Sequence, residues 1–189
     1  MKNKIMTCVL SLLIFSMAAS LLPCVAQDNS VSSPAAINTR VRSMIELGSV
    51  YTNIYDIAIT VLETVRGKEA LDRLKATDAS NPAPAEGFEY ILARVKFEHK
   101  GRYVSDTLPM DLGHDPLQWV ALSSDMTEYP RVSLKAPAPA LVGQVKPGDS
   151  MEGWVAFAVK QTDPKPVMVF DPDTGGATGR GKTIFFKLY

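Results

Sequence analysis

The sequence predicts an all-β fold, an immunoglobulin-like antiparallel β-sandwich of about seven or eight strands with one short helical or loop insertion. Three observations favour this fold. Apolar segments rich in β-branched and aromatic residues recur between turn signals. Good helix formers are concentrated in residues 67–75. The chain of 189 residues is 46% hydrophobic and 21% charged, which suits one globular domain and a short extra segment.

The first 26 residues are typical of a secretory signal peptide. Lys2 and Lys4 precede a nearly continuous apolar run at 5–22, and the small-x-small site Cys24-Val25-Ala26 follows. Two alternatives stay open. An apolar run of about 18 residues is just long enough for a retained membrane anchor. Cys24 is also a candidate for lipidation, although Pro23 stands where bacterial lipoprotein signals carry a small residue.

The rest of the chain divides into two parts. Residues 27–42 contain three serines and Pro34-Ala35-Ala36 and show no periodicity, which indicates a flexible spacer. Residues 43–189 are expected to form the folded domain. The predicted location is therefore secreted or cell-surface, with membrane contact only through an uncleaved signal segment or a lipidated Cys24.

Charge and cysteine content exclude several classes of function. The 20 basic and 20 acidic residues cancel, and no run of lysines or arginines provides the field of a nucleic-acid binder. Cleavage after Ala26 would remove both cysteines, Cys8 and Cys24. The exported chain would then have no disulfide, thiol nucleophile or cysteine metal ligand.

The first part of the domain combines a long strand pattern with the insertion. Residues 43–65 alternate β-branched and polar positions on both sides of Gly48, which predicts strand structure. Residues 67–85 interrupt that pattern with a helix-forming stretch and a proline-rich end. We expect a short helix whose Leu71 and Leu74 pack on the sheet; a partner-binding loop is the alternative.

The clearest strand pattern begins at Gly87 and ends at Gly101. One face carries the apolar residues Ile91, Ala93, Val95 and Phe97. The other face is apolar at first and then becomes charged, so one end of this strand should be covered by another element and the other end should face solvent.

Shorter strands are predicted in the middle of the chain. Residues 106–116 form a loop, 118–122 a strand and 132–134 a shorter strand. Residues 136–140, alternating alanine and proline, form a rigid extended connection.

Residues 147–159 combine a Pro-Gly turn with an almost uncharged strand. The inward residues are Val155, Phe157 and Val159, and the outward ones are Trp154, Ala156 and Ala158. Small alanines let a neighbouring element lie close, which predicts a central strand. The chain ends in a predicted hairpin of 167–170 with 183–189.

Two strand patterns carry a family resemblance. They read GFEYILARVKFEHKG (87–101) and VKPGDSMEGWVAFAV (145–159), followed by the apolar hairpin. This order resembles the immunoglobulin-like domains of unknown function in bacterial secreted proteins and lipoproteins, whose relatives include the mycobacterial immunoprotective extracellular antigen. The resemblance covers 43–189 and implies an extracytoplasmic domain without established catalytic residues.

Candidate metal ligands are few in this sequence. His99 and His114 would need carboxylates such as Asp111 or Asp115 to complete a zinc site, and solvent-exposed loop histidines are the favoured interpretation. Residues 171–176 resemble the start of a calcium loop, but Arg180 follows where further oxygen ligands are needed. The sequence therefore predicts no metal and no cofactor.

Other catalytic patterns are incomplete. Residues 175–183 end in Gly-Lys-Thr like a phosphate loop, yet a strand follows instead of a helix. Two carboxylate pairs, Glu86 with Glu89 and Asp149 with Glu152, lie at strand entrances where acidic residues are commonly solvated. The methionines at 110, 126, 151 and 168 are scattered and do not indicate a copper site.

Aromatic residues provide the candidate partner-binding positions. These are Tyr51, Tyr55, Tyr103, Trp119 and Tyr129, which would form a sugar or peptide platform if they shared one face. The favoured hypothesis is an exported, non-enzymatic domain that binds an extracellular protein or glycan at the bacterial cell surface. The alternatives are an envelope lipoprotein with a stress or assembly role and a metal-assisted hydrolase.

Overall fold

The computed structural model describes residues 29–48, 51–112, 118–173 and 179–189. The predicted signal peptide (1–26) lies outside the described residues, as do His114 and Asp115. No helix in the described ranges is long and apolar enough to cross a membrane.

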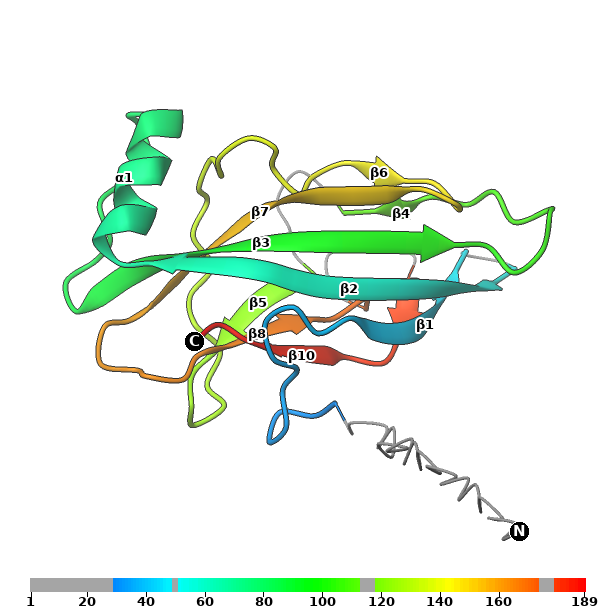
Figure 1. The fold of residues 1–189 in the computed structure, drawn as a ribbon, viewed down its shortest axis with the longest axis horizontal. Coiled ribbons are helices and arrows are strands. Elements are labelled where there is room, and N and C mark those ends of the chain that lie inside the picture. Colours follow the sequence, from blue (N-terminus) through cyan, green and yellow to red (C-terminus); the bar gives the residue numbers. More distant parts are fainter. Residues whose placement is uncertain (1–28, 49–50, 113–117, 174–178) are drawn as a thin grey trace, which may run out of the picture.

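Long antiparallel strands dominate the structure (Figure 1). A five-stranded sheet has the order β7-β3-β2-β1-β9, a three-stranded sheet the order β10-β8-β5, and β4 pairs with β6. The strands are β1 (Val41–Leu47), β2 (Asn53–Arg66), β3 (Phe88–Lys100), β4 (Met110–Asp111), β5 (Trp119–Leu122), β6 (Gln144–Val145), β7 (Ser150–Lys160), β8 (Val167–Phe170), β9 (Gly179–Gly181) and β10 (Ile184–Lys187). The all-β prediction is confirmed at this level.

The single helix of the described residues, α1 (Lys68–Thr77), occupies the predicted insertion. Gly67 precedes it with a φ of 68°, a left-handed conformation that glycine adopts without steric cost. Ala70 and Leu74 are four residues apart and therefore lie on one face of the helix, where both are buried. The expectation that Leu74 packs on the sheet is confirmed.

The two larger sheets share one core, here called the inner cluster. It includes Ile57, Ile91, Val95, Phe97, Trp119, Val155, Phe157, Phe170 and Phe186. Alternation along β3 and β7 places every second side chain on this face, as predicted. The predicted pairing of β8 with β10 is also confirmed, although β9 lies between them in the chain and pairs with β1 of the other sheet.

A second group of side chains, the outer cluster, covers the opposite face of the five-stranded sheet. It consists of Val65, Ala70, Leu74, Tyr90, Leu92, Trp154 and Ala158, with Val132, Leu134, Ala136 and Ala156 packed against it. The helix thus covers the beginning of β3, where the sequence predicted a covered end.

Several expectations differ from the structure. The described residues form ten strands, more than the seven or eight expected, and residues 106–116, expected as a loop, include β4, which pairs with β6. Residues 132–134 form no strand, because no neighbour supplies a backbone ladder for them. β7 is an edge strand and not a central one.

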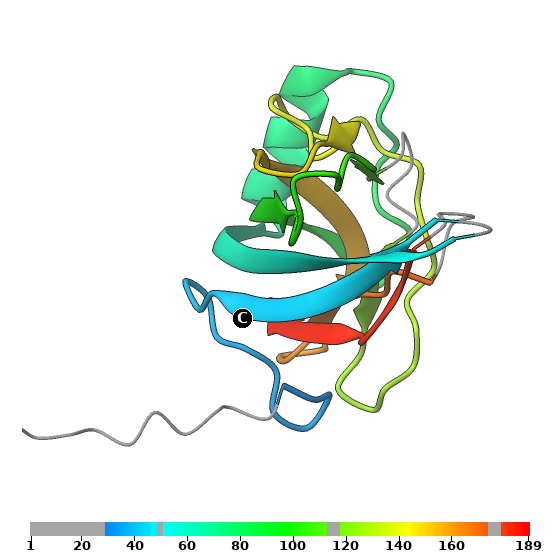
Figure 2. The same ribbon diagram turned by 90° about the vertical axis from the view of Figure 1, so that its right-hand side faces the viewer.

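A further difference concerns residues 27–42, expected as a flexible spacer. The segment before β1 passes beside β10 (Figure 2), and near its end the backbone N–H of Asn38 bonds the carbonyl of Val61 on β2. Ala35 is buried and exchanges backbone hydrogen bonds with the 185–187 stretch, and the Asn29 amide bonds the backbone of Phe185 at 2.8 Å. The missing periodicity predicts a lack of regular structure, but it does not exclude pairing of single residues with a sheet edge.

Candidate functional site

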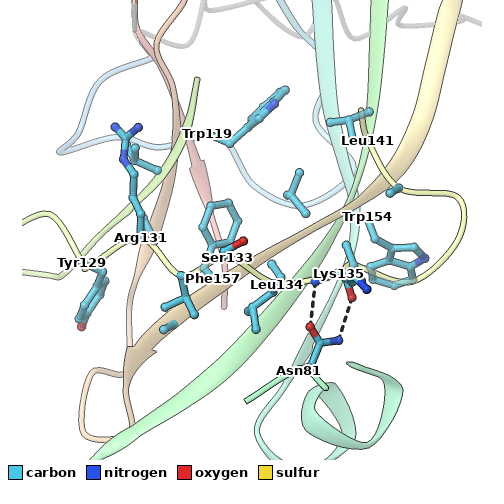
Figure 3. Close-up of a pocket in the computed structure, with 18 of the residues that line it drawn as sticks. Asn81, Trp119, Tyr129, Arg131, Ser133, Leu134, Lys135, Leu141, Trp154 and Phe157 are labelled. Carbon is cyan, nitrogen blue, oxygen red and sulfur yellow. Dashed lines mark hydrogen bonds between the residues drawn. The ribbon is translucent and has the colours of Figure 1, made fainter. Parts of the chain in front are cut away.

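A pocket of about 660 Å³, here called the edge pocket, lies where the edge strands β5 and β7 of the two sheets approach each other (Figure 3). Its walls come from β5, from residues 154–158 of β7 and from the loop at 140–142. Residues 130–136, here called the strap, form the remaining wall. The lining includes Asn81, Trp119, Tyr129, Arg131, Ser133, Leu134, Lys135, Leu141, Trp154, Ala156, Phe157 and Ala158.

One end of the strap is held by the loop that follows α1. The Asn81 side chain is buried and donates to the carbonyls of Leu74 at 2.8 Å and Lys135 at 3.0 Å. Its oxygen accepts from the Lys135 backbone N–H at 2.8 Å, and both contacts to the strap are visible in Figure 3. The Lys135 ammonium also pairs with Asp78 and holds the pKa of that carboxyl well below its usual range. Side-chain bonds therefore replace strand pairing at this end.

The other end of the strap is held by Tyr129. Its backbone N–H bonds the carbonyl of Ala121 on β5, and its hydroxyl donates to Asp163 at 2.7 Å. Burial and the Asp163 carboxylate raise the pKa of Tyr129 to about 12. Burial opposes the charge on Asp163, but hydrogen bonds from the Lys165 backbone, Tyr129 and Ser124 leave its pKa below the ordinary value.

The outer edge of β7 is only partly paired. The backbone N–H of Trp154 donates to the carbonyl of Pro139 at 2.8 Å, and the backbone carbonyl of Trp154 accepts from the N–H of Leu141 at 3.1 Å. In an antiparallel ladder, residues two apart point their backbone groups the same way, so Ala156 and Ala158 also point away from β3. In the described part of the chain, neither alanine has a backbone hydrogen bond on that side. These two positions form part of the lining of the edge pocket.

The wall from β5 includes Trp119, which is 3% exposed. Its ring packs in the inner cluster, 4.7 Å from that of Phe170, and its indole N–H has no hydrogen-bond partner within the described ranges. A buried donor without an acceptor costs about 1–3 kcal/mol.

The side chains of the edge pocket suit binding better than acid–base chemistry. Its described lining carries Arg131 and Lys135 but no histidine, cysteine, aspartate or glutamate. Arg131 pairs with Glu128 and Lys135 with Asp78, so the pocket combines apolar walls with open backbone groups.

The aromatic platform predicted from Tyr51, Tyr55, Tyr103, Trp119 and Tyr129 is not formed. Tyr55 and Trp119 belong to the core, and Tyr129 is 6% exposed. Their apolar neighbours on alternating strand positions bury them. Tyr51 (87% exposed) and Tyr103 (75%) lie in the connections after β1 and β3 and not at the edge pocket. Trp119 and Tyr129 do line that pocket.

His99 is not the exposed loop residue that the sequence favoured. It lies at the end of β3, 2% exposed, with Nδ1 at 2.8 Å from the Val145 carbonyl. A carbonyl only accepts, so Nδ1 carries the proton. Burial lowers the pKa of His99 and favours the neutral ring. Among the described residues, no group of three or more His, Cys, Asp and Glu side chains could hold a metal ion.

The other candidate patterns have structural roles where they are described. In the calcium-like stretch, Asp173 accepts a hydrogen bond from the Gly181 backbone N–H at 3.1 Å. In the phosphate-like stretch, β9 pairs with β1. The centres of both stretches, residues 174–178, lie outside the described residues. Glu89 pairs with Arg66 at 2.6 Å and Glu152 with Arg94.

The four methionines do not gather at one place. Met110 and Met168 are buried in the inner cluster, Met151 is partly buried against it, and Met126 is 62% exposed.

Sequence reasoning missed the strap and Asn81 as functional positions. The alternation of Val132, Leu134 and Ala136 was visible, and it does place these side chains against the outer cluster. Their position beside an open strand edge depends on hydrogen bonds between residues 54 positions apart, which no local pattern encodes.

Comparison with known proteins gives little further detail. No protein-family model matches the sequence, and no curated protein is significantly similar to it. A solved structure from Bacillus subtilis subsp. subtilis str. 168, described as a "putative lipoprotein (ycdA)", is similar over 69% of this chain at 13% identity, with a TM-score of 0.43. The match spans 36% of that chain, or little more than a third of its length.

Proposed function

We propose that this protein is an exported, non-enzymatic domain that binds a protein or glycan partner at the bacterial cell surface through the edge pocket. The observation that carries the proposal is the open stretch of β7 inside a largely apolar pocket. Open backbone groups and apolar walls favour binding, and the lining lacks the acid and base residues of a hydrolase. The immunoglobulin-like topology and the membership of the secreted-antigen family are part of the same proposal.

Site-specific photo-crosslinking in the source organism tests the binding function. Ser133 is exposed and belongs to the strap, so a benzophenone amino acid at this position would face a bound partner. Asp149 is exposed, precedes β7 and does not line the pocket, so it serves as the matched control. We expect a covalent adduct from position 133 and none from position 149. Equal adducts from both positions, or none from either, would contradict the proposal.

Intact-mass spectrometry of the supernatant and membrane fractions tests export. A supernatant species that begins at Gln27 would support a free secreted domain. A membrane species that begins at lipid-modified Cys24 would favour the envelope lipoprotein. A species that retains Met1 and stays inside the cell would contradict export.

A further inference from the structure

We propose that the partner of the edge pocket is an extended peptide that adds a strand to β7 by pairing with Ala156 and Ala158. This inference rests on the proposed function and names the chemical class of the partner. Strand addition to an open sheet edge draws its affinity from backbone hydrogen bonds and its specificity from the side-chain pockets.

The open part of the edge has defined limits. Trp154 is already paired on one side of the gap through Pro139 and Leu141. On the other side, the Tyr129 hydroxyl interacts with the backbone of Lys160. Between them, the N–H and C=O groups of Ala156 and Ala158 point outward without a backbone partner among the described residues. Because a strand rises about 3.3 Å per residue, a segment of about four or five extended residues would cover this gap.

The strap does not fill this gap. The described structure has no backbone hydrogen bond between residues 130–136 and β7, and the pocket of about 660 Å³ touches both. The strap is held from its two ends by Asn81 and Tyr129. It therefore forms a wall beside the edge and leaves the alanine positions unpaired.

A peptide fits this site better than a sugar does. Both tryptophan rings that line the pocket are buried, with Trp119 3% and Trp154 8% exposed, so neither offers an open ring face for stacking. Arg73 also lies over the ring of Trp154, 5.3 Å from its centre. A strand would instead supply alternating donors and acceptors to the open backbone groups of the two alanines.

The charge of the lining sets no preference for the charge of the peptide. Arg131 pairs with Glu128 at 3.2 Å and Lys135 pairs with Asp78, so both cations of the pocket already have a carboxylate partner. We therefore expect the backbone of a bound strand, and not its net charge, to carry recognition.

Selection from a display library of random seven-residue peptides tests the inference. The immobilised full chain is compared with Ala156→Pro, which removes the outward N–H without touching the ladder to β3, and with Ala156→Ser, which keeps it. Thermal unfolding confirms that each variant is folded. We expect at least about tenfold enrichment on the wild type and on Ala156→Ser, and loss of enrichment on Ala156→Pro. Equal enrichment on all three chains would overturn the inference.

Amide NMR provides a readout that does not depend on the proline variant. One enriched peptide is titrated into the ¹⁵N-labelled wild-type chain. We expect the amides of Ala156 and Ala158 to shift and their hydrogen exchange to slow at least about tenfold, whereas Val155 and Phe157, already paired with β3, should change less. Unchanged exchange at both alanines would overturn strand addition even if the peptide binds.

The two proposals fail in different ways. If position 133 crosslinks a glycan and no peptide is enriched, the proposed function stands and the peptide inference is wrong. If peptides are enriched and shift the amide signals of both alanines, but position 133 gives no adduct in the source organism, then the edge pocket binds strands and the proposed cell-surface function is wrong.

Discussion

The two faces of the five-stranded sheet differ in how they are covered. A second sheet covers the inner face, and the shared cluster is a continuous core. One helix and the strap cover the outer face, and side-chain bonds from Asn81 and Tyr129 hold the strap in place. A cover attached at its ends leaves backbone groups of the sheet edge open, and the edge pocket lies at that position. The comparison shows how a binding groove arises where a cover lacks strand pairing.

The largest expected effect comes from truncating the inner face. Phe97 is fully buried, with its ring 5.8 Å from that of Phe170. We expect Phe97→Ala to lower the free energy of unfolding by about 3–5 kcal/mol, because paired sheets on both sides limit collapse into the cavity. Leu74→Ala makes the matched change on the outer face, where the helix can shift, and should cost about 2–3 kcal/mol. Denaturant unfolding measures both, and an equal or greater loss for Leu74→Ala would contradict the comparison.

The next effect concerns the attachment of the strap. Asn81→Ala removes two donated bonds and one accepted bond, and leaves the backbone groups of Leu74 and Lys135 without this partner. We expect a loss of about 1–3 kcal/mol and faster hydrogen exchange at the Lys135 amide. Ser133→Ala lies in the same exposed segment and serves as the control. Unchanged exchange at Lys135 in Asn81→Ala would show that something other than Asn81 holds the strap.

The smallest expected effect is a pH dependence at the end of the inner face. Burial lowers the pKa of His99 below its unfolded value of about 6.5, so the unfolded chain binds the proton more readily. The contribution of neutral His99 to stability is therefore complete above about pH 6.5 and is lost as the pH falls through the lowered value. Asp106 opposes this shift without reversing it.

Thermal unfolding between pH 7 and pH 4 checks this expectation. The wild type should lose stability more steeply than His99→Asn, whose side chain does not titrate in this range. The amide of asparagine still offers a donor to the Val145 carbonyl. Parallel curves for the two chains would mean that His99 does not contribute to the acid sensitivity.

Most of the strand and helix assignments could be predicted from local sequence, because alternation and helix propensity act over neighbouring residues. The inward and outward residues of β3 and β7 and the position of α1 follow from these patterns. Residues 132–134 of the strap were predicted as a strand from their side chains, but strand structure also requires a hydrogen-bonding partner for the backbone. Local patterns do not specify that partner.

The candidate site was less predictable than the fold. Tyr55 and Trp119 were chosen as aromatic, yet aromatic side chains serve core and surface equally well, and burial in the inner cluster decides between them. His99 was expected in solvent, and here too the tertiary structure and not the residue type decides burial. Residues 29–40 were likewise predicted as part of a spacer, because the pairing of Ala35 with β10 depends on residues far apart in the chain.

By itself, the sequence determined that this protein is rich in β-strands, where its helix lies and which side chains of the long strands face the core. These properties depend on residue type and on spacing within a few positions. Only the tertiary structure decided that β7 is an edge, that Ala156 and Ala158 keep open backbone groups, and that a strap held by Asn81 stands beside them. Those features depend on hydrogen bonds between residues far apart in the chain, and such pairings are set by how the sheets pack.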